Sequence, residues 1–284
     1  MLARALALLS VVLGPGSLVL GPGSFVLGPA ARTWDQGPGT KDQGRYVESI
    51  AGTLVSFEMV RVPAGSGVAE FYIGRTEVTW DLFDVYMLRL DSSKPHAEAD
   101  AIARPSEPYG APDYGWGHAG FPAMSIAAGS AQSFCRWLSA KTGRTYRLPT
   151  DAEWTHAATL ASRGEGGAKV SIDEVSWHGG NANARTHPVG TRRPDALGLS
   201  DLFGNVAEWV STGADSYTTR GGSYRELASA LGPTTRADQD ASWNERDPQL
   251  PKSRWWLSDG PFVGFRVVSG VVPRSVENSG DIAR

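Results

Sequence analysis

The chain has 284 residues, 41% of them hydrophobic, which is enough to bury one sizeable core. Its 27 lysine and arginine residues are scattered along the sequence, and together with 30 aspartate and glutamate residues they give a formal net charge of −3. This excludes the basic surface that nucleic-acid binding needs, so no nucleic-acid partner is expected. The 34 glycines and 10 tryptophans indicate a loop-rich fold fixed by large aromatic side chains.

The first 31 residues differ in composition from the remainder. Arg4 is the only early charge, an apolar run covers residues 6–13, and the small residues Gly28 and Ala30 suit a cleavage site. This order predicts a signal peptide over residues 1–31 and a secreted or periplasmic protein. The alternative is a start codon assigned too far upstream, followed by low-complexity sequence. The Pro-Gly interruptions at 14–16 and 21–23 argue against a stable membrane span, which needs roughly 20 consecutive apolar residues.

Residues 32–52 are rich in glycine and predict a linker, residues 53–270 a single domain, and residues 271–284 a disordered tail. Strands are predicted from Leu54 to Val62 and from Phe71 to Ile73. Thr79 caps a predicted helix whose apolar pattern runs to Leu90. Residues 91–123 predict a loop rich in proline, glycine and tyrosine.

Two further helices have clear end signals. Apolar residues at helical spacing precede Gly143, a typical C-terminal cap, and place Cys135 on the buried face. Thr150 and Glu153 form a capping box that begins the next helix. Beyond Arg163 the pattern predicts short strands at 187–190, 206–210, 220–223 and 264–268. The expected fold class is α+β, with small mixed sheets, two or three helices and long structured loops.

Seven short motifs follow one another in this region. They are Arg75-Thr76-Glu77-Val78-Thr79, Cys135-Arg136-Trp137-Leu138 with Thr142-Gly143-Arg144, Arg147-Leu148-Pro149-Thr150-Asp151-Ala152-Glu153-Trp154, His187-Pro188-Val189-Gly190, Gly204-Asn205-Val206-Ala207-Glu208-Trp209, Arg220-Gly221-Gly222-Ser223 and Gly264-Phe265-Arg266-Val267-Val268. In this order they resemble the formylglycine-generating enzyme and sulfatase-modifying factor family over roughly residues 52–270. The resemblance implies that family's variant of the C-type lectin fold.

The resemblance also implies a structural calcium site. Family members bind calcium through one side-chain oxygen, two backbone carbonyls and a glutamate, and the matching residues here are Asp201, Gly204, Val206 and Glu208. Hard oxygen ligands of this kind suit calcium. The alternative is that Asp201 and Glu208 are solvated or hydrogen-bonded to the backbone.

The chain departs from the family at the catalytic centre. Copper-dependent members use two cysteines between the Arg-Gly-Gly and Gly-Phe-Arg motifs, whereas Cys135 is the only cysteine here. Residues 225–263 contain no cysteine, histidine or methionine, the soft or imidazole ligands that copper prefers. Copper is therefore not expected as a cofactor, and no catalytic residue can be assigned.

Two hypotheses for function remain. The first is a ligand-binding or accessory module for a peptide, glycan or small molecule, whose candidate residues are Trp243, Glu245, Asp247, Trp255 and Trp256, with Phe262 beside them. The alternative is a divergent copper-free oxidoreductase, like the family's periplasmic pyoverdine-maturation enzyme, which also lacks the cysteine pair. That activity would draw on the acids of the same segment, namely Glu226, Asp238, Asp240, Glu245 and Asp247.

Overall fold

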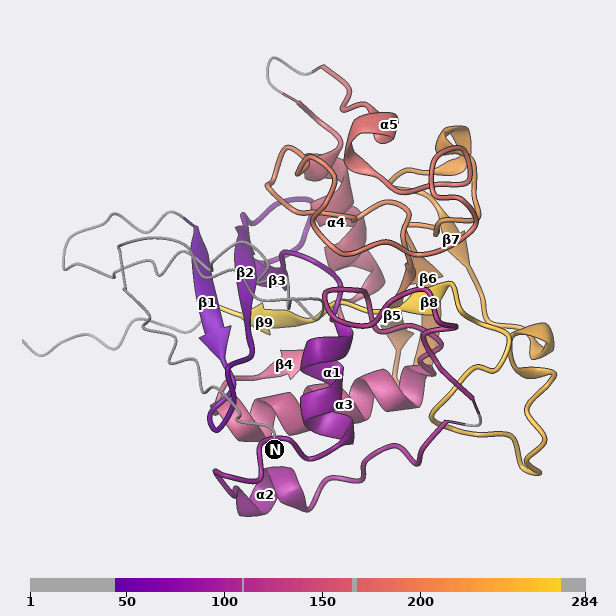
Figure 1. Ribbon diagram of the computed structural model, residues 1–284. Helices are drawn as coiled ribbons and strands as arrows, with labels where there is room; N and C mark the ends of the chain where they lie inside the picture. Colours follow the sequence, from indigo (N-terminus) through magenta and orange to yellow (C-terminus); the bar gives the residue numbers. More distant parts are fainter. Residues whose placement is uncertain (1–43, 109, 165–167, 272–284) are drawn as a thin grey trace, which may run out of the picture. The chain divides into compact units, whose positions relative to one another are not determined.

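The computed structural model describes residues 44–108, 110–164 and 168–271 (Figure 1). The predicted leader at 1–31 and all but the first residue of the predicted tail lie outside this part of the chain. Among the described residues, no helix is long and apolar enough to cross a membrane.

The first sheet is antiparallel and has the strand order β1-β2-β3-β9-β4. Its strands are β1 (Arg45–Ser49), β2 (Ser56–Val62), β3 (Phe71–Gly74), β9 (Val268–Gly270) and β4 (Tyr146–Arg147). The two predicted strands in this region are confirmed. Strand β1, however, occupies residues predicted as linker, because it pairs with β2 along its whole length and Tyr46 packs edge-on against Tyr72.

The second sheet has the order β7-β6-β5-β8. Its strands are β7 (Arg236–Ala237), β6 (Ser216–Arg220), β5 (Ala207–Gly213) and β8 (Val263–Gly264), and only the β5–β8 pair is parallel. The predicted strand at 220–223 is displaced toward the N-terminus, because Gly221 and Gly222 have positive φ and end β6. The predicted strand at 187–190 is absent and this segment is irregular and ends in a turn, since Pro188 has no N–H for a ladder and Gly190 has φ +69°.

Three longer helices are present in the described residues, α1 (Trp80–Met87), α3 (Ala128–Thr142) and α4 (Asp151–Ala161), with short helices α2 (Ala97–Asp100) and α5 (Ile172–Val175) and 3₁₀ turns η2 (Ala228–Ala230) and η3 (Ala241–Asn244). The predicted caps at Thr79, Gly143 and Thr150 are confirmed. Helix α1 ends before the predicted Leu90, which is exposed, and α2 lies within residues predicted as loop.

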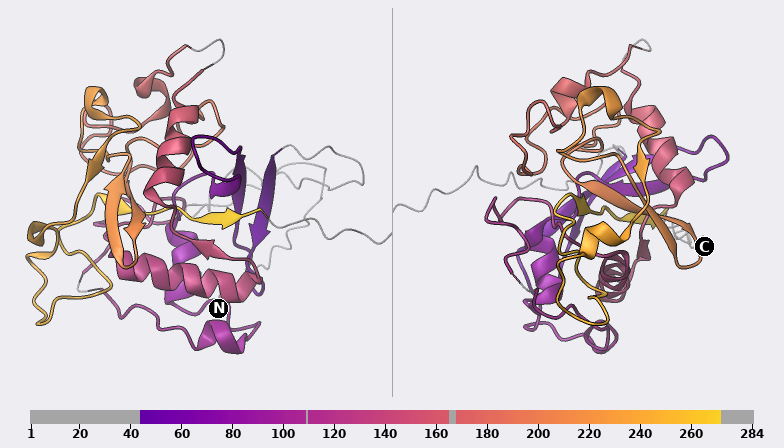
Figure 2. Two further views of the ribbon diagram at one scale, coloured as in Figure 1. Left: turned by 180° about the vertical axis from the view of Figure 1, so that it is seen from behind. Right: turned by 90° about the vertical axis from the view of Figure 1, so that its right-hand side faces the viewer.

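Helix α3 runs beneath the two sheets (Figure 2) and closes the main core. Phe134 stacks on Phe83 of α1 at 5.8 Å between ring centroids. Trp209 of β5 is buried and donates its indole N–H to the Ile126 carbonyl at 2.7 Å. The segment between β8 and β9 joins the two sheets, and this connection carries Arg266 into the interior.

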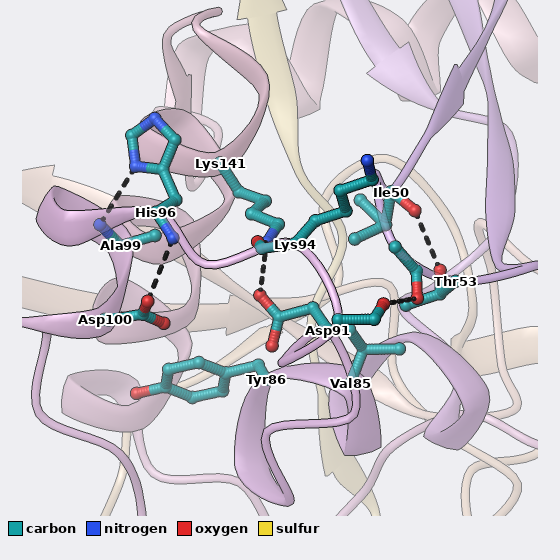
Figure 3. A network of polar contacts seen from close by, with 12 residues as sticks. Ile50, Thr53, Val85, Tyr86, Asp91, Lys94, His96, Ala99, Asp100 and Lys141 are labelled. Carbon is teal, nitrogen blue, oxygen red and sulfur yellow. Dashed lines mark hydrogen bonds and ion pairs between the residues drawn. The ribbon is translucent and has the colours of Figure 1, made fainter.

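A buried ion pair attaches the segment after α1 to α3 (Figure 3). Lys141 Nζ lies 2.8 Å from Asp91 Oδ2, and both side chains are almost fully buried. The same ammonium group donates to the Lys94 carbonyl at 2.5 Å. Nearby, Ser93 donates its hydroxyl to the Gly52 carbonyl at 2.9 Å. These contacts fix the beginning of the long segment whose later residues form one wall of the candidate site.

Candidate functional site

Two neighbouring hollows form a groove between residues 107–108 and 110–116 on one side and the loops at 224–225 and 244–261 on the other. The first hollow has a volume of about 430 Å³, and the second about 500 Å³. They share Tyr114 and Arg246, so these two side chains stand between them. The lining is a mixture of aromatic, apolar and charged groups, which is typical of a ligand-binding surface.

A histidine clamp holds the first wall of this groove. The His118 ring accepts or donates hydrogen bonds at 2.8 Å to Asp84 of α1 and at 3.0 Å to Asp113, and it stacks on Trp80 at 5.0 Å. Partial burial lowers the pKa of His118, but the hydrogen bonds to Asp84 and Asp113 outweigh it and the pKa is raised. The ring therefore bridges Asp84 and Asp113 and fixes the loop next to Tyr114.

An arginine–aspartate pair organises the opposite wall. Asp259 accepts from the Arg246 backbone N–H at 2.7 Å and also pairs with the Arg246 guanidinium. The Ser258 hydroxyl donates to Asp259 at 2.7 Å. Although its partial burial raises the pKa of Asp259, these hydrogen bonds lower it to about 2. Tyr114 Oη donates to the Ser258 carbonyl at 2.6 Å, which joins the two walls.

The second hollow has an aromatic wall that no pattern in the sequence predicts. Trp116 packs edge-on against Tyr224 and at a tilt against Tyr114, both at 5.4 Å between ring centroids. Arg225 lies 3.9 Å above the Phe262 ring. The only sequence signal for this wall was the tyrosine-rich composition of residues 91–123, because the contributing segments are far apart in the chain.

The predicted tryptophans do not form an exposed aromatic face. Trp243 is 7% exposed and packs on Trp209 and Phe262, and Trp256 is 6% exposed and donates its indole N–H to the Ser106 carbonyl at 2.8 Å. Trp256 nevertheless lines the first hollow. Trp255 is half-buried, with the Arg254 guanidinium 4.3 Å above its ring.

The two predicted acids differ in their surroundings. Asp247 is buried at the edge of the first hollow, where it accepts backbone N–H groups from Gln249 at 2.9 Å and Ser253 at 2.6 Å. These bonds outweigh the effect of burial and lower the pKa of Asp247, which therefore stabilises the loop as a carboxylate. Glu245 is exposed and does not line either hollow.

The other acids of the segment accept hydrogen bonds from their own loops or from β6. Glu226 accepts from the Ser223 N–H at 2.6 Å, Asp238 from the Thr218 hydroxyl at 2.6 Å, and Asp240 from the Ser242 N–H at 2.7 Å. Within the described ranges, histidine, cysteine and acidic side chains form no group of three or more that could hold a metal ion. Cys135 is buried as predicted, and burial raises the pKa of its thiol to about 12.

The residues predicted to bind calcium lie elsewhere, in the interior beside Arg266. Glu208 is fully buried and forms a two-point ion pair with this arginine, with Oε1–Nη2 2.6 Å and Oε2–Nε 2.7 Å apart. Trp154 donates its indole N–H to Glu208 at 2.9 Å. Arg266 also donates to the carbonyls of Gly74 at 2.9 Å and Ser200 at 3.2 Å. Glu208 is therefore already neutralised by a protein cation.

Asp201 and Glu77 form the remainder of this buried acidic cluster. Asp201 Oδ2 accepts the Gly190 N–H at 2.6 Å, while Oδ1 and both Glu77 carboxylate oxygens have no hydrogen-bond partner among the described residues. Burial raises the pKa of Asp201 to about 6, and burial together with the Asp201 charge raises the pKa of Glu77 well above its usual range. The cluster thus contains unpartnered oxygen atoms of the kind a hard cation would use.

Gly204 and Val206 follow in an irregular segment before β5. Gly204 has φ +81°, and a Cβ there would lie 2.1 Å from the Trp177 carbonyl oxygen, so only glycine fits. Val206 is buried against Gly264 of β8. This local packing explains the glycine of the motif without reference to a metal.

Comparison with known proteins places these features in a family. Residues 11–270 match the family described as "Sulfatase-modifying factor enzyme 1-like domain". The chain is 33% identical over 112 residues to the formylglycine-generating enzyme of Mycobacterium tuberculosis, covering 33% of this chain and 34% of that one. It is 30% identical over 168 residues to the inactive C-alpha-formylglycine-generating enzyme 2 of Bos taurus, covering 53% and 50%. The matches to these curated relatives span at most half of their length.

The fold agrees with this assignment. The structure of PvdO from Pseudomonas aeruginosa is similar with a TM-score of 0.55 and 23% identity, covering 82% of this chain and all of that one. The mixed α+β architecture with two small sheets is the formylglycine-generating-enzyme variant of the C-type lectin fold. The chain belongs to the sulfatase-modifying factor enzyme 1-like domain family.

Proposed function

We propose that this chain is an exported ligand-binding or accessory module, and that its binding surface is the groove of two hollows. The observation that carries the proposal is the lining of the groove, which combines four aromatic side chains and two arginines with three acids. Aromatic and arginine side chains provide much of the binding energy in protein recognition sites. The candidate ligands are a peptide, a glycan or a small molecule.

The environment of the acids favours binding over catalysis. A general acid or base needs a carboxyl group free to contact substrate. Glu226 and Asp240 instead accept hydrogen bonds within their own loops, and Asp238 accepts one from Thr218 of β6. Asp247 holds two backbone N–H groups, and Glu245 is exposed but lines neither hollow. The copper-free oxidoreductase is therefore the alternative and would need a catalytic group supplied in another way. The similarity to a protein named an inactive formylglycine-generating enzyme also supports binding over catalysis.

The test is a selection of binders from peptide, glycan and small-molecule arrays, followed by titration with a groove variant. Trp116→Ala should abolish binding while lowering the melting temperature no more than the control variant does, since both aromatic side chains are partly buried. Tyr217→Ala, a partly buried aromatic on β6 outside the groove, is the matched control. Equal binding by both variants would reject the groove as the site.

A parallel assay addresses the alternative. A cysteine peptide of the sulfatase type, incubated with the protein with and without copper, should remain unmodified in a mass spectrum, because the chain has only the buried Cys135 to offer as a thiolate. Conversion of the cysteine to formylglycine would establish the oxidoreductase and reject the accessory role.

A structural calcium ion in the buried acidic cluster is a separate proposal. Asp201 Oδ1 and the Glu77 carboxylate supply donor atoms that suit calcium, whereas Glu208 is occupied by Arg266. Asp201 thus remains a candidate ligand from the predicted set, and Glu77 replaces Glu208 as the second acid. Such an ion would offset the negative charge of the cluster and stabilise the folded state.

A further inference from the structure

One arginine in the second hollow has no carboxylate partner. Arg225 is exposed, its guanidinium lies 3.9 Å from the Phe262 ring centroid, and its Nε donates to the Tyr224 hydroxyl at 3.3 Å. No acidic side chain in the described part of the chain lies within ion-pair distance of it. Stacking on the aromatic ring fixes the plane of the guanidinium and leaves its terminal N–H groups available.

The other charges of this hollow cancel. Its charged lining residues are Arg225, Arg246 and Asp259, and Asp259 is bound to Arg246 through both the backbone N–H and the guanidinium. Glu226, the next residue after Arg225, directs its carboxylate to the Ser223 N–H and hydroxyl. Among the charged residues that line this hollow, Arg225 is therefore the one without an ion-pair partner.

Local packing keeps Arg225 at this position. The Gly179 N–H donates to the Glu226 carbonyl at 2.7 Å, and a Cβ on Gly179 would lie 2.7 Å from the Arg225 carbonyl oxygen. Because only glycine allows this approach, the segment at 179 supports the backbone beneath Arg225. The guanidinium is thus presented by a fixed backbone and an aromatic ring.

We propose that the second hollow binds the carboxylate of a peptide, with Arg225 as the anchoring residue. A single guanidinium offers two parallel N–H groups, which match a planar monoanionic carboxylate. A phosphate ester carries about −1.5 to −2 charge at neutral pH, more than one free guanidinium balances. The aromatic wall of Tyr114, Trp116 and Tyr224 would pack against the chain that carries the carboxylate.

The first hollow favours a peptide as the carrier. It continues from the second past Tyr114 and Arg246, and its lining combines the apolar Pro108, Pro112 and Leu257 with Gln249, whose side-chain amide has no hydrogen-bond partner among the described residues. An extended peptide offers both apolar side chains and backbone hydrogen-bonding groups to such a lining. The inference rests on the proposed binding function and specifies its ligand.

The experiment uses arrays of hexapeptides of random sequence in four forms. These have a free C-terminal carboxylate without acidic residues, an amidated C-terminus with one glutamate, an amidated C-terminus without acids, and an amidated C-terminus with one phosphoserine. Selected peptides are titrated against wild type, Arg225→Leu, Arg225→Lys and Arg193→Leu by calorimetry. Arg193, an exposed arginine paired with Glu174, lies outside both hollows and controls for the loss of one surface charge.

Binding should require a carboxylate, and the first two forms tell whether it comes from the C-terminus or from an acidic side chain. Arg225→Leu should lower the affinity for peptides that carry a carboxylate about tenfold or more, as expected for the loss of a charge-assisted hydrogen bond. Arg225→Lys should retain part of the affinity, and Arg193→Leu all of it. Added salt should reduce the binding of wild type more than that of Arg225→Leu.

Other outcomes overturn the inference. Preferred binding of the acid-free amides, with loss of affinity in Trp116→Ala but not in Arg225→Leu, would reject the carboxylate and leave the groove as a binding site. Preferred binding of the phosphoserine peptides would reject a monoanionic carboxylate as the ligand group. If no form binds while glycans do, the peptide is wrong but the binding module stands, and if nothing binds in any array, both proposals fail.

Discussion

Replacing Arg266 by methionine tests whether the interior is held by the Glu208–Arg266 pair. The substitution leaves Glu208 with the Trp154 N–H as its remaining partner, and leaves the Gly74 and Ser200 carbonyls without their guanidinium donor. Breaking a buried ion pair costs about 3–5 kcal/mol, and an orphaned buried acceptor about 1–3 kcal/mol. Since these contributions are not additive, we expect a loss of about 4–6 kcal/mol, a large share of a typical domain's stability.

Urea unfolding followed by tryptophan fluorescence measures this loss as a lower midpoint at an unchanged slope. The double variant Glu208→Gln/Arg266→Met should lose less than the sum of the two single variants, because neither charge is then left alone. A loss below about 1 kcal/mol for Arg266→Met would refute this account of the pair. Recovery of Arg266→Met by calcium would show instead that a metal can replace the guanidinium at Glu208.

Three further substitutions and one chelation experiment extend the test. His118→Gln should be less stable than wild type at acidic pH. Because the folded-state pKa of His118 is raised, the stability that its ring contributes is complete below about pH 6.5, the usual pKa of histidine. This contribution disappears as the pH rises through the folded-state pKa, so the unfolding midpoints of wild type and variant should converge across this range. Lys141→Met should cost about 3 kcal/mol in urea unfolding, since Asp91 then stays buried with only Arg104 at 3.7 Å; a cost near zero would show that the pair is not stabilising. Gly143→Ala should cost about 1 kcal/mol in thermal unfolding, because φ is +71° at this helix cap. Chelation should lower the melting temperature of wild type but not of Asp201→Asn, and equal transitions with and without chelator would remove calcium from the account.

Local sequence determined the helix ends. Thr150 and Glu153 form the predicted capping box within four residues, and Gly143 adopts the predicted left-handed cap. Such signals are readable because donor and acceptor are close in the chain. The buried position of Cys135 followed from helical spacing in the same way. The sequence alone also showed that the thiolate pair of the copper-dependent relatives is missing.

Only the tertiary structure decided which side chains face the groove. Trp243 was a reasonable aromatic candidate, but its neighbours Trp209 and Phe262 come from other segments and bury it. The groove instead uses residues such as Tyr114 and Arg246, which are separated by more than a hundred positions and meet only after folding. Spacing along a chain cannot report such long-range packing, because it depends on how the sheets and loops are placed.

The same limit applied to the acidic motif before β5. Its spacing matched a calcium loop, yet Glu208 pairs with Arg266 from the connection between β8 and β9. A carboxylate removed from water needs a cation, and the sequence cannot show whether a metal or a distant arginine supplies it. Arg266 lies between the two sheets and supplies the cation for Glu208, whereas Glu77 and Asp201 form no direct ion pair within the described residues.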